Sequence, residues 1–167
     1  LFFHKHRIFL SFFIPPVIPE CLCRGSIYAV FSGSPLTSCG NLAIANVQYV
    51  LGGPVSINSS TCFNVQAANV TLDCAGFSIS GNNTAGTSGI YSNNFNFTAI
   101  KNCAISNFTY GVFFNRASNG TIQNVTVASS ASNPGHGIYL NASSNSNTII
   151  MSTGTSTSND GIHIDNS

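Results

Sequence analysis

The sequence predicts an all-β protein, a parallel β-helix (solenoid) of about five coils. Three observations predict it: a glycine tetrad that recurs in the second half, short β-branched segments that recur with the same period, and a polar composition almost without charge. No long amphipathic helical pattern follows residue 30.

The glycine tetrad is the strongest of these signals. It occurs as Gly89-Ile90-Tyr91-Ser92, Gly111-Val112-Phe113-Phe114, Gly137-Ile138-Tyr139-Leu140 and Gly161-Ile162-His163-Ile164. Successive glycines are 22, 26 and 24 residues apart. A unit of this length is too small to bury its own apolar face, and stacking successive units solves that problem.

A second short segment precedes each tetrad. The four segments are Val70-Thr71-Leu72, Thr98-Ala99-Ile100, Gly120-Thr121-Ile122 and Asn147-Thr148-Ile149. Their β-branched residues, and the Asn, Gly and Ser clusters between them, favour strands over helices. The two middle segments continue in one register, so that Asn102 matches Asn124. Because Asn adopts left-handed backbone conformations, both are expected at a corner between two strands.

Stacking in register predicts two buried columns. Each coil of a parallel β-helix adds about 4.8 Å, the spacing of paired strands. One column should hold Leu72, Ile100, Ile122 and Ile149, and the other Ile90, Val112, Ile138 and Ile162. Less regular first coils are expected at Leu42-Ala43-Ile44, Val55-Ser56-Ile57 and Cys62-Phe63-Asn64-Val65. The alternative fold, a β-sandwich, would need turns about every 8 to 12 residues, and the repeat here is longer.

The composition limits the choice of partners. Charged residues make up 5% of the chain, and the formal net charge is +1. There is no basic field to attract nucleic acid, which is therefore not an expected partner.

The first 29 residues are interpreted as a secretory leader. His4, Lys5, His6 and Arg7 form a positive cluster, and an apolar stretch from Ile8 to Ile18 follows it. This stretch is shorter than the roughly 17 to 25 residues that span a bilayer, so no membrane span is expected in the mature chain. Residues 30–167 are then one β-helix domain, truncated at its C-terminus, in an extracellular, cell-surface or periplasmic location.

Four cysteines remain after such a leader is removed: Cys39, Cys62, Cys74 and Cys103. An even set permits three disulfide pairings, of which the nearest neighbours are Cys39 with Cys62 and Cys74 with Cys103. The alternative for Cys74 and Cys103 is that they are small apolar core residues. The cysteine spacings do not form a zinc pattern.

Two stretches carry a resemblance to a known group. They are Asn69–Gly81 and Ile100–Asn107, preceded by Cys39–Leu42 and Cys62–Val65 and followed by the glycine tetrads. From Cys39 onward the chain resembles exported and cell-surface repeat proteins of the right-handed parallel β-helix type. Members of this group include polysaccharide lyases and hydrolases, epimerases, adhesins and periplasmic accessory proteins for copper enzymes. The resemblance implies a carbohydrate-related role.

The chain offers few groups for catalysis. After the leader its only acids are Asp73, Asp160 and Asp165, and its only strong cations are Lys101 and Arg116. Glycoside hydrolysis usually needs two carboxyl groups flanking the bond, and a calcium-dependent lyase needs an acidic cluster and a base. Asp73 is expected to bond backbone amides at a corner instead. Catalytic residues are therefore not assigned, and the chain is not expected to be an enzyme.

One weak catalytic candidate comes from the repeat alignment. The residues before the four glycines are Ser88, Tyr110, His136 and Asp160. Asp160 should therefore stack next to His136 and could orient it as a base, with His163 nearby. A polar corner pair without a substrate is the favoured interpretation. Copper and other cofactors are not expected, because Met151 is alone and the histidines are scattered along the sequence.

The outer surface of the repeats gives a binding hypothesis. Side chains alternate faces along a strand, so inward Ile and Val residues place their neighbours outward in one vertical row. This row consists of Tyr91, Phe113, Tyr139 and His163. Flat rings flanked by Asn and Ser can stack on sugar rings, although aromatic neighbours can also simply stabilise the sheet.

Taken together, these observations predict an exported or cell-surface, non-catalytic module whose partner is a polysaccharide or other glycan. The alternative is a fragment of a polysaccharide lyase or glycoside hydrolase whose catalytic coils are absent or incomplete, and a third is a structural spacer. An uncapped last coil would expose strand edges, so end-to-end self-association of the fragment is also expected.

Eight Asn-X-Ser/Thr sequons add candidate glycan sites to the chain. Asn82 and Asn141, in looser Gly/Ser/Asn stretches, are the favoured ones.

Overall fold

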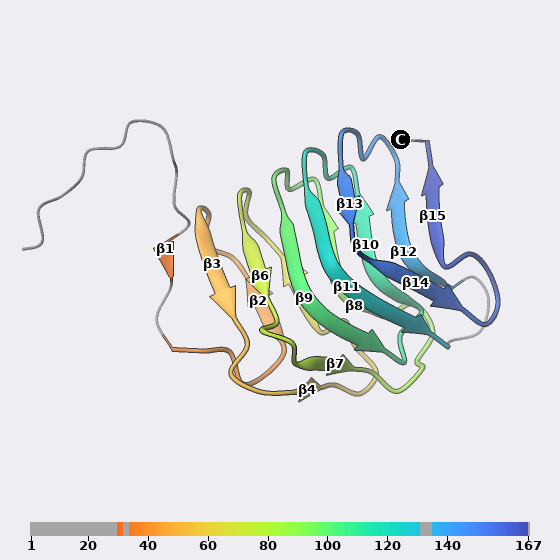
Figure 1. Ribbon diagram of the computed structural model, residues 1–167, viewed down its shortest axis with the longest axis horizontal. Helices are drawn as coiled ribbons and strands as arrows, with labels where there is room; N and C mark the ends of the chain where they lie inside the picture. The colour runs from red at the N-terminus through yellow and green to blue at the C-terminus, as the bar shows by residue number, and fades with distance from the viewer. Residues whose placement is uncertain (1–29, 32–33, 131–134, 167) are drawn as a thin grey trace, which may run out of the picture.

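The computed structural model describes residues 30–31, 34–130 and 135–166 (Figure 1). The leader predicted at residues 1–29 lies outside this range. The described residues form β-strands joined by turns, with no α-helix, stacked as a parallel solenoid of about five turns. Nothing in this part of the chain is therefore a helix that could span a membrane. The predicted fold class is confirmed.

The described residues contain fifteen strands. They are β1 (Val30–Phe31), β2 (Gly40–Leu42), β3 (Val47–Val50), β4 (Val55–Ser56), β5 (Phe63–Val65), β6 (Thr71–Asp73), β7 (Ser78–Ser80), β8 (Ser88–Asn93), β9 (Ala99–Ser106), β10 (Tyr110–Asn115), β11 (Thr121–Ser129), β12 (His136–Asn141), β13 (Thr148–Ile150), β14 (Thr153–Ser156) and β15 (Ile162–Asp165).

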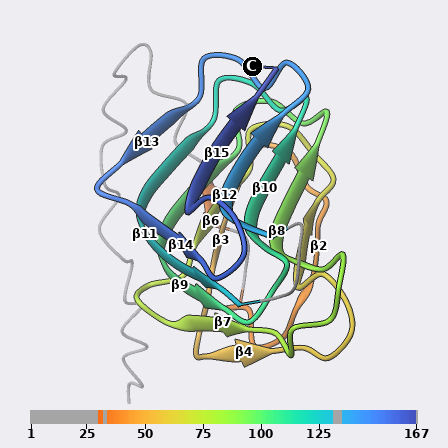
Figure 2. The ribbon, with the colours of Figure 1, turned by 90° about the vertical axis from the view of Figure 1, so that its right-hand side faces the viewer.

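The strands form two sheets of parallel neighbours that face each other (Figure 2). One sheet has six strands in the order β15-β12-β10-β8-β5-β2, and the glycine tetrads lie in it. The other has nine strands, with the main order β1-β3-β6-β9-β11-β13. The second halves of β9 and β11 leave this path to pair with β7 and β14, and together with β4 they form a third face.

Both predicted columns are present. Leu72, Ile100, Ile122 and Ile149 are successive register partners in the nine-stranded sheet. Ile90, Val112, Ile138 and Ile162 are successive partners in the six-stranded sheet. The inner members are fully buried, and each such side chain contributes roughly 1.5–3 kcal/mol to the stability of the fold. Ile162 is 41% exposed, because it lies in the last described coil.

The recurring glycine is explained by close contact between two faces of the solenoid. The first three tetrad glycines are buried, and they point toward the third face. A Cβ at Gly89 would clash with Ile105, one at Gly111 with Val127, and one at Gly137 with the backbone of Gly154. Each would also clash with the carbonyl oxygen of the next tetrad glycine. The repeat therefore marks the line along which the six-stranded sheet meets the third face without room for a side chain.

Asparagine ladders form the corners, as the sequence predicts. Asn102 and Asn124 have φ angles of 54° and 53°, in the left-handed region. The Asn124 amide donates to Asn102 Oδ1, and the Asn102 amide donates to Asp73 Oδ1, both at 2.9 Å. Asp73 also accepts from the Ala75 N–H at 2.9 Å, in line with its expected corner role. A second ladder joins Asn115 to Asn93 at 3.0 Å.

Both nearest-neighbour disulfides are present. Cys39 is bonded to Cys62 and Cys74 to Cys103, with Cα–Cα distances of 4.7 and 4.9 Å. These distances match the spacing of neighbouring coils, so each disulfide links one coil to the next. The alternative of free thiols in the core at Cys74 and Cys103 is therefore wrong.

Two details of the ends differ from expectation. Asn141, favoured as a glycan site in a loose stretch, is the last residue of β12 and pairs in register with Asn115 and Asp165. Ile44, expected in a first coil, follows β2 and is 57% exposed.

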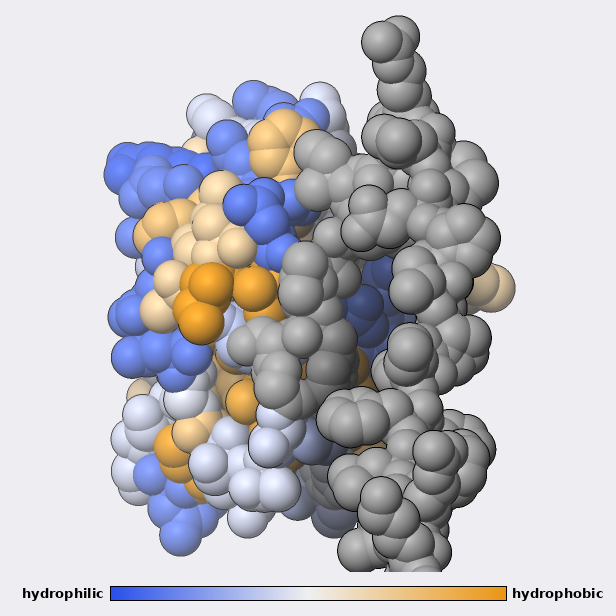
Figure 3. Space-filling model, turned by 90° about the vertical axis from the view of Figure 1, so that its left-hand side faces the viewer, coloured by the Kyte–Doolittle hydropathy of each residue, from blue (hydrophilic) through white to orange (hydrophobic). Residues whose placement is uncertain are grey.

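Hydrophobic and hydrophilic residues are mixed on the side of the stack where the first coils lie (Figure 3).

The close approach at the tetrads can be tested with Gly111→Ala. The new Cβ would meet Val127 and lie 2.7 Å from the Gly137 carbonyl oxygen, so the free energy of unfolding should fall by about 1–3 kcal/mol in urea titrations. Gly40→Ala, in the same sheet, is the matched control, since nothing lies within 4 Å of its Cβ position. Its stability should change by less than about 0.5 kcal/mol. Equal effects of the two substitutions would contradict the packing argument.

The Cys74–Cys103 disulfide can be tested with the double variant Cys74→Ala/Cys103→Ala. The bond closes a loop with a sequence separation of 29 residues, so its removal should lower the free energy of unfolding by about 2–4 kcal/mol. Urea unfolding of the oxidised parent and of the variant measures this difference. An unchanged unfolding midpoint would show that the bond does not constrain the chain.

Candidate functional site

The predicted outward row of rings is present on the six-stranded sheet. Tyr91, Phe113, Tyr139 and His163 are successive register partners on β8, β10, β12 and β15. Their ring centroids are separated by 5.2, 4.9 and 5.3 Å from one coil to the next. All four side chains are half-buried, so each ring keeps an accessible part.

A second, shorter row runs beside the first. Tyr110 and His136 are register partners at the starts of β10 and β12, with ring centroids 6.2 Å apart. The Tyr110 ring lies 4.9 Å from that of Phe113 and 5.6 Å from that of Tyr139. The rings of both rows therefore form one continuous surface, which we call the ring face: Tyr91, Tyr110, Phe113, His136, Tyr139 and His163.

The place of Tyr110 on the ring face was not predicted from the sequence. Strict alternation puts Tyr110 on the same side as Val112, which is inside. In β10, however, Gly111 and Val112 are both buried, so the alternation breaks and Tyr110 points outward again. The same break occurs in β12 at Gly137 and Ile138. The signal that could have revealed it is the glycine itself, since a buried glycine next to a buried Ile or Val marks two inward positions in a row.

A hollow lies at the N-terminal end of the ring face. Its volume is about 220 Å³, and it is lined by Thr61, Gly86, Ser88, Tyr91, Tyr110 and Phe113. The lining combines three rings, two of them phenols, with the aliphatic hydroxyls of Thr61 and Ser88. The Ser88 N–H donates to Thr61 Oγ1 at 3.2 Å, which fixes one of these hydroxyl oxygens at the rim.

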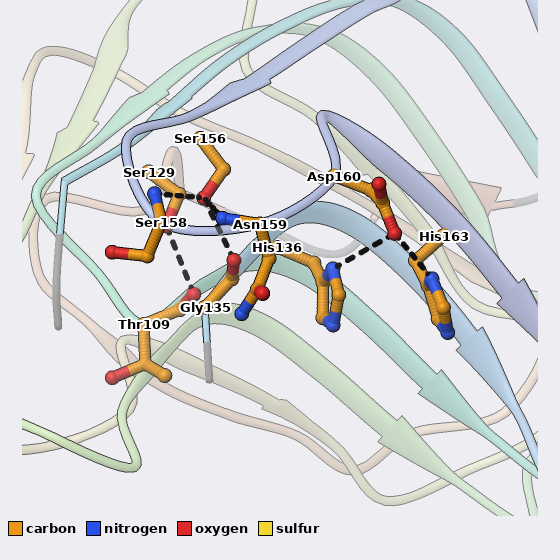
Figure 4. A network of polar contacts seen from close by, with 9 residues as sticks. All are labelled: Thr109, Ser129, Gly135, His136, Ser156, Ser158, Asn159, Asp160 and His163. Atoms are coloured by element: carbon orange, nitrogen blue, oxygen red, sulfur yellow. Dashed lines mark hydrogen bonds and ion pairs between the residues drawn. The ribbon is translucent and has the colours of Figure 1, made fainter. Parts of the chain in front are cut away.

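The opposite end of the ring face carries the predicted His-Asp group. Asp160 lies in the turn between β14 and β15, and its Oδ2 is 2.7 Å from His163 Nδ1. The distance from the same oxygen to His136 Nδ1 is 4.0 Å, too long for a hydrogen bond. Asp160 is therefore next to His136, as the repeat alignment indicates, but its hydrogen bond goes to His163 (Figure 4).

A network of hydrogen bonds holds the turn that carries Asp160. Ser156 Oγ donates to the Gly135 carbonyl at 2.7 Å and accepts from the N–H groups of Ser158 and Asn159 at 3.3 and 3.2 Å. The Asp160 carbonyl accepts from Gly137 N–H at 3.3 Å. These bonds fix the turn against the start of β12 (Figure 4).

Burial changes the pKa of three groups on the ring face. It lowers the pKa of His136, which the nearby His163 lowers further, while Asp160 acts in the opposite direction. Burial raises the pKa of Tyr110. It also raises the pKa of Tyr139, and Asp165 and Tyr110 add to that shift. Neutral His136 and neutral phenols are therefore favoured on this surface.

The His-Asp group can also hold a metal ion. One ligand atom from each of His136, Asp160 and His163 can be chosen so that all three lie within 4.8 Å of one another. Within residues 30–31, 34–130 and 135–166, this is the only such group of three. The histidines are scattered along the sequence, but the solenoid stacks the rings of His136 and His163 with centroids 4.4 Å apart. The glycine repeat indicated this proximity, since His136 lies next to Gly137 and both Asp160 and His163 lie close to Gly161, the equivalent glycine of the next coil.

Comparison with known proteins gives a family. No curated protein and no solved structure matches the chain. A family model does match, over residues 37–167, which is most of the chain; its description is NosD, periplasmic copper-binding protein. A periplasmic family agrees with the expected extracellular or periplasmic location and with the presence of two disulfides. The chain, an exported parallel β-helix repeat protein, belongs to the NosD family.

Proposed function

We propose that this protein is an exported β-helix module that binds carbohydrate on its ring face without catalysing a reaction. The single observation that carries the proposal is the ring face itself. It presents rings about 5 Å apart over four successive coils and ends in a hollow lined by rings and hydroxyls.

The chemistry of the ring face matches that of a sugar. The faces of a pyranose ring are apolar and stack on flat aromatic side chains, while its hydroxyls need hydrogen-bonding partners. Ser88 and Thr61 supply hydroxyls in the hollow, and Asn93 and Asn115 supply amides at the other ends of β8 and β10. A row of rings along the solenoid axis suits an extended chain of sugars better than a single one.

The charges near the ring face favour a neutral glycan. Lys101 lies on the other sheet, where it pairs in register with Asp73 and Gln123. Asp160 lies just before β15 and Asp165 is the last residue of β15, so the two carboxylates flank the strand that ends the ring face. Arg116 is exposed and directly follows β10 in the same sheet, so one cation stands against two carboxylates. Because the carboxylates outnumber it and would repel a uronate, neutral polysaccharides are the proposed ligands.

Asp73 is not free for catalysis. Its carboxylate accepts hydrogen bonds from the Ala75 N–H and the Asn102 amide at a corner of the sheet opposite the ring face. A two-carboxylate mechanism would therefore have only Asp160 and Asp165 to draw on in this part of the chain, and Asp160 is bonded to His163.

The family name adds a second candidate function, the binding of copper. One observation favours it for this chain: His136, Asp160 and His163 bring two imidazoles and a carboxylate together at the C-terminal end of the ring face. Imidazole nitrogens suit copper, and the carboxylate adds a negative charge. This site and the hollow lie at different ends of the ring face, so the two functions do not exclude each other.

Carbohydrate binding can be tested with the double variant Tyr91→Ala/Tyr139→Ala. Each lost ring should cost about 1 kcal/mol of binding free energy, so affinity for neutral polysaccharide should fall at least about tenfold in affinity electrophoresis. Phe97→Ala is the matched control, since Phe97 is a 55% exposed ring outside the ring face. Unchanged mobility of the double variant, with folding intact by circular dichroism, would refute the proposal. The same electrophoresis in a gel that contains a uronate polysaccharide should show weaker binding by the parent protein than a gel that contains neutral polysaccharide.

The rings should also stabilise the fold, and this contribution is measured separately. A double-mutant cycle of Phe113→Ala and Tyr139→Ala should give a coupling of about 0.5–1.5 kcal/mol in urea unfolding, because the two rings are stacked at 15° with centroids 4.9 Å apart. Additive effects within about 0.3 kcal/mol would show that the rings do not support each other.

A further inference from the structure

Three ligating side chains converge at the end of the ring face, and each comes from a different part of the last two described coils. His136 begins β12, His163 is the second residue of β15, and Asp160 lies in the turn before β15. Their ligand atoms lie within 4.8 Å of one another. The rings of the two histidines are stacked at an angle of 21°. The Nδ1 atoms of both rings face the same oxygen, Asp160 Oδ2 (Figure 4).

A second observation at this site also points to a ligand. Nδ1 of His136 is buried and has no hydrogen-bond partner, and the residue as a whole is only 9% exposed. It is the only buried side-chain nitrogen or oxygen without a partner among the described residues that are not exposed. Buried polar atoms in folded proteins nearly always have a partner, and a metal ion is a common partner for the nitrogen of a neutral imidazole. The orphaned nitrogen faces the Asp160 carboxylate at 4.0 Å, and a bound ion would provide the partner that it lacks.

The distances at the site suit a small metal ion. Ligand atoms about 2.0–2.2 Å from an ion lie roughly 3.4 Å apart in tetrahedral coordination and about 3 Å apart when they are neighbours in tetragonal coordination. The two measured distances from Asp160 Oδ2, 4.0 Å to His136 Nδ1 and 2.7 Å to His163 Nδ1, lie on either side of both values. The spacing of the three donors is therefore close to what one shared ion requires.

The positions of the donors are set in advance by their surroundings. The His136 ring packs 4.9 Å from the ring of Tyr139, and the His163 ring lies 5.3 Å from it. The turn that carries Asp160 is tied to the start of β12 by the hydrogen bonds of Ser156 and of the Asp160 carbonyl. Preorganised donors lose little conformational freedom on binding, which favours affinity.

We infer that His136, Asp160 and His163 form a site for one transition-metal ion, with copper(II) bound most tightly. The choice of copper rests on the second function proposed above, whereas the site itself rests on the convergence of the donors. Two imidazoles and one carboxylate are donors that copper(II), nickel(II) and zinc(II) accept, whereas calcium and magnesium prefer oxygen ligands alone. Within the first group, copper(II) is the strongest binder by the Irving–Williams order. Three protein donors leave at least one position on the ion for an external ligand.

The test is isothermal titration of the full chain, freed of metal with a chelator, using copper(II), zinc(II) and calcium(II) as probes. We expect one tight copper(II) site, weaker zinc(II) binding and no calcium(II) binding at this site. Electron paramagnetic resonance of the copper(II)-loaded chain should show hyperfine coupling to imidazole nitrogen. Loading should also raise the melting temperature, because the ion joins two coils.

Variants assign the site to its residues. His136→Asn and His163→Asn should each weaken copper(II) binding at least about tenfold, since even residues behind the ligands of a metal site commonly change affinity about 10- to 100-fold. Asp160→Asn should weaken it too. The full chain used here retains residues 1–29 and so contains two further histidines, His4 and His6, which provide the control. His4→Asn/His6→Asn should leave the tight site and its nitrogen coupling unchanged.

The outcomes separate this inference from carbohydrate binding. Loss of copper(II) binding in His4→Asn/His6→Asn, or its retention in His136→Asn and His163→Asn with folding intact, would overturn the assignment. Tight zinc(II) binding with weak copper(II) binding would overturn the choice of ion. Tyr91→Ala, at the other end of the ring face, should weaken glycan binding and leave copper(II) binding as it is, so failure of either function is seen independently.

Discussion

In-register pairing of parallel strands is the constraint on which this structure depends. Each residue of a coil lies directly over its counterpart in the next coil, so a choice made once in the repeat is repeated along the stack. The same register that piles Ile over Val in the core piles Tyr over Phe on the outside. The core and the ring face are two consequences of one geometry, and neither could shift by one residue without destroying the other.

Two recurring residue types, Asn at the corners and Gly where two faces meet, let the coils pack closely with few charged residues. Asn side chains take the left-handed conformation and bond to the Asn of the next coil, as at Asn102 and Asn124. Glycines remove side chains where the six-stranded sheet meets the third face, as at Gly111. Neutral amides bond one coil to the next, and glycines permit close packing, so neither device needs charge in a chain with only 5% charged residues.

The sequence predicted the fold and the outward row because both follow from periodicity. Equivalent positions such as Ile138 and Ile162 could be aligned from the glycine spacing alone. Tyr110 was missed because strict alternation fails where Gly111 and Val112 are both buried. The recurring glycine is the local sign of this break, but its cause is the close approach of Val127 on the third face, which lies elsewhere in the sequence. The bond of Asp160 to His163 in preference to His136 depends on how the turn before β15 folds, and no repeat pattern fixes the path of a turn. The orphaned Nδ1 of His136 became visible only once burial was known.

The placement of the disulfides has a mechanical consequence. Cys39–Cys62 and Cys74–Cys103 each clip one coil to the next, and both lie before β10 in the chain. A solenoid pulled from its ends yields coil by coil, since each coil holds only to its neighbours. Tension on this protein would therefore be borne by covalent bonds across those two loops and by hydrogen bonds and packing alone in the coils described beyond Cys103. The part of the chain that carries His136 and His163 is the part that would peel first.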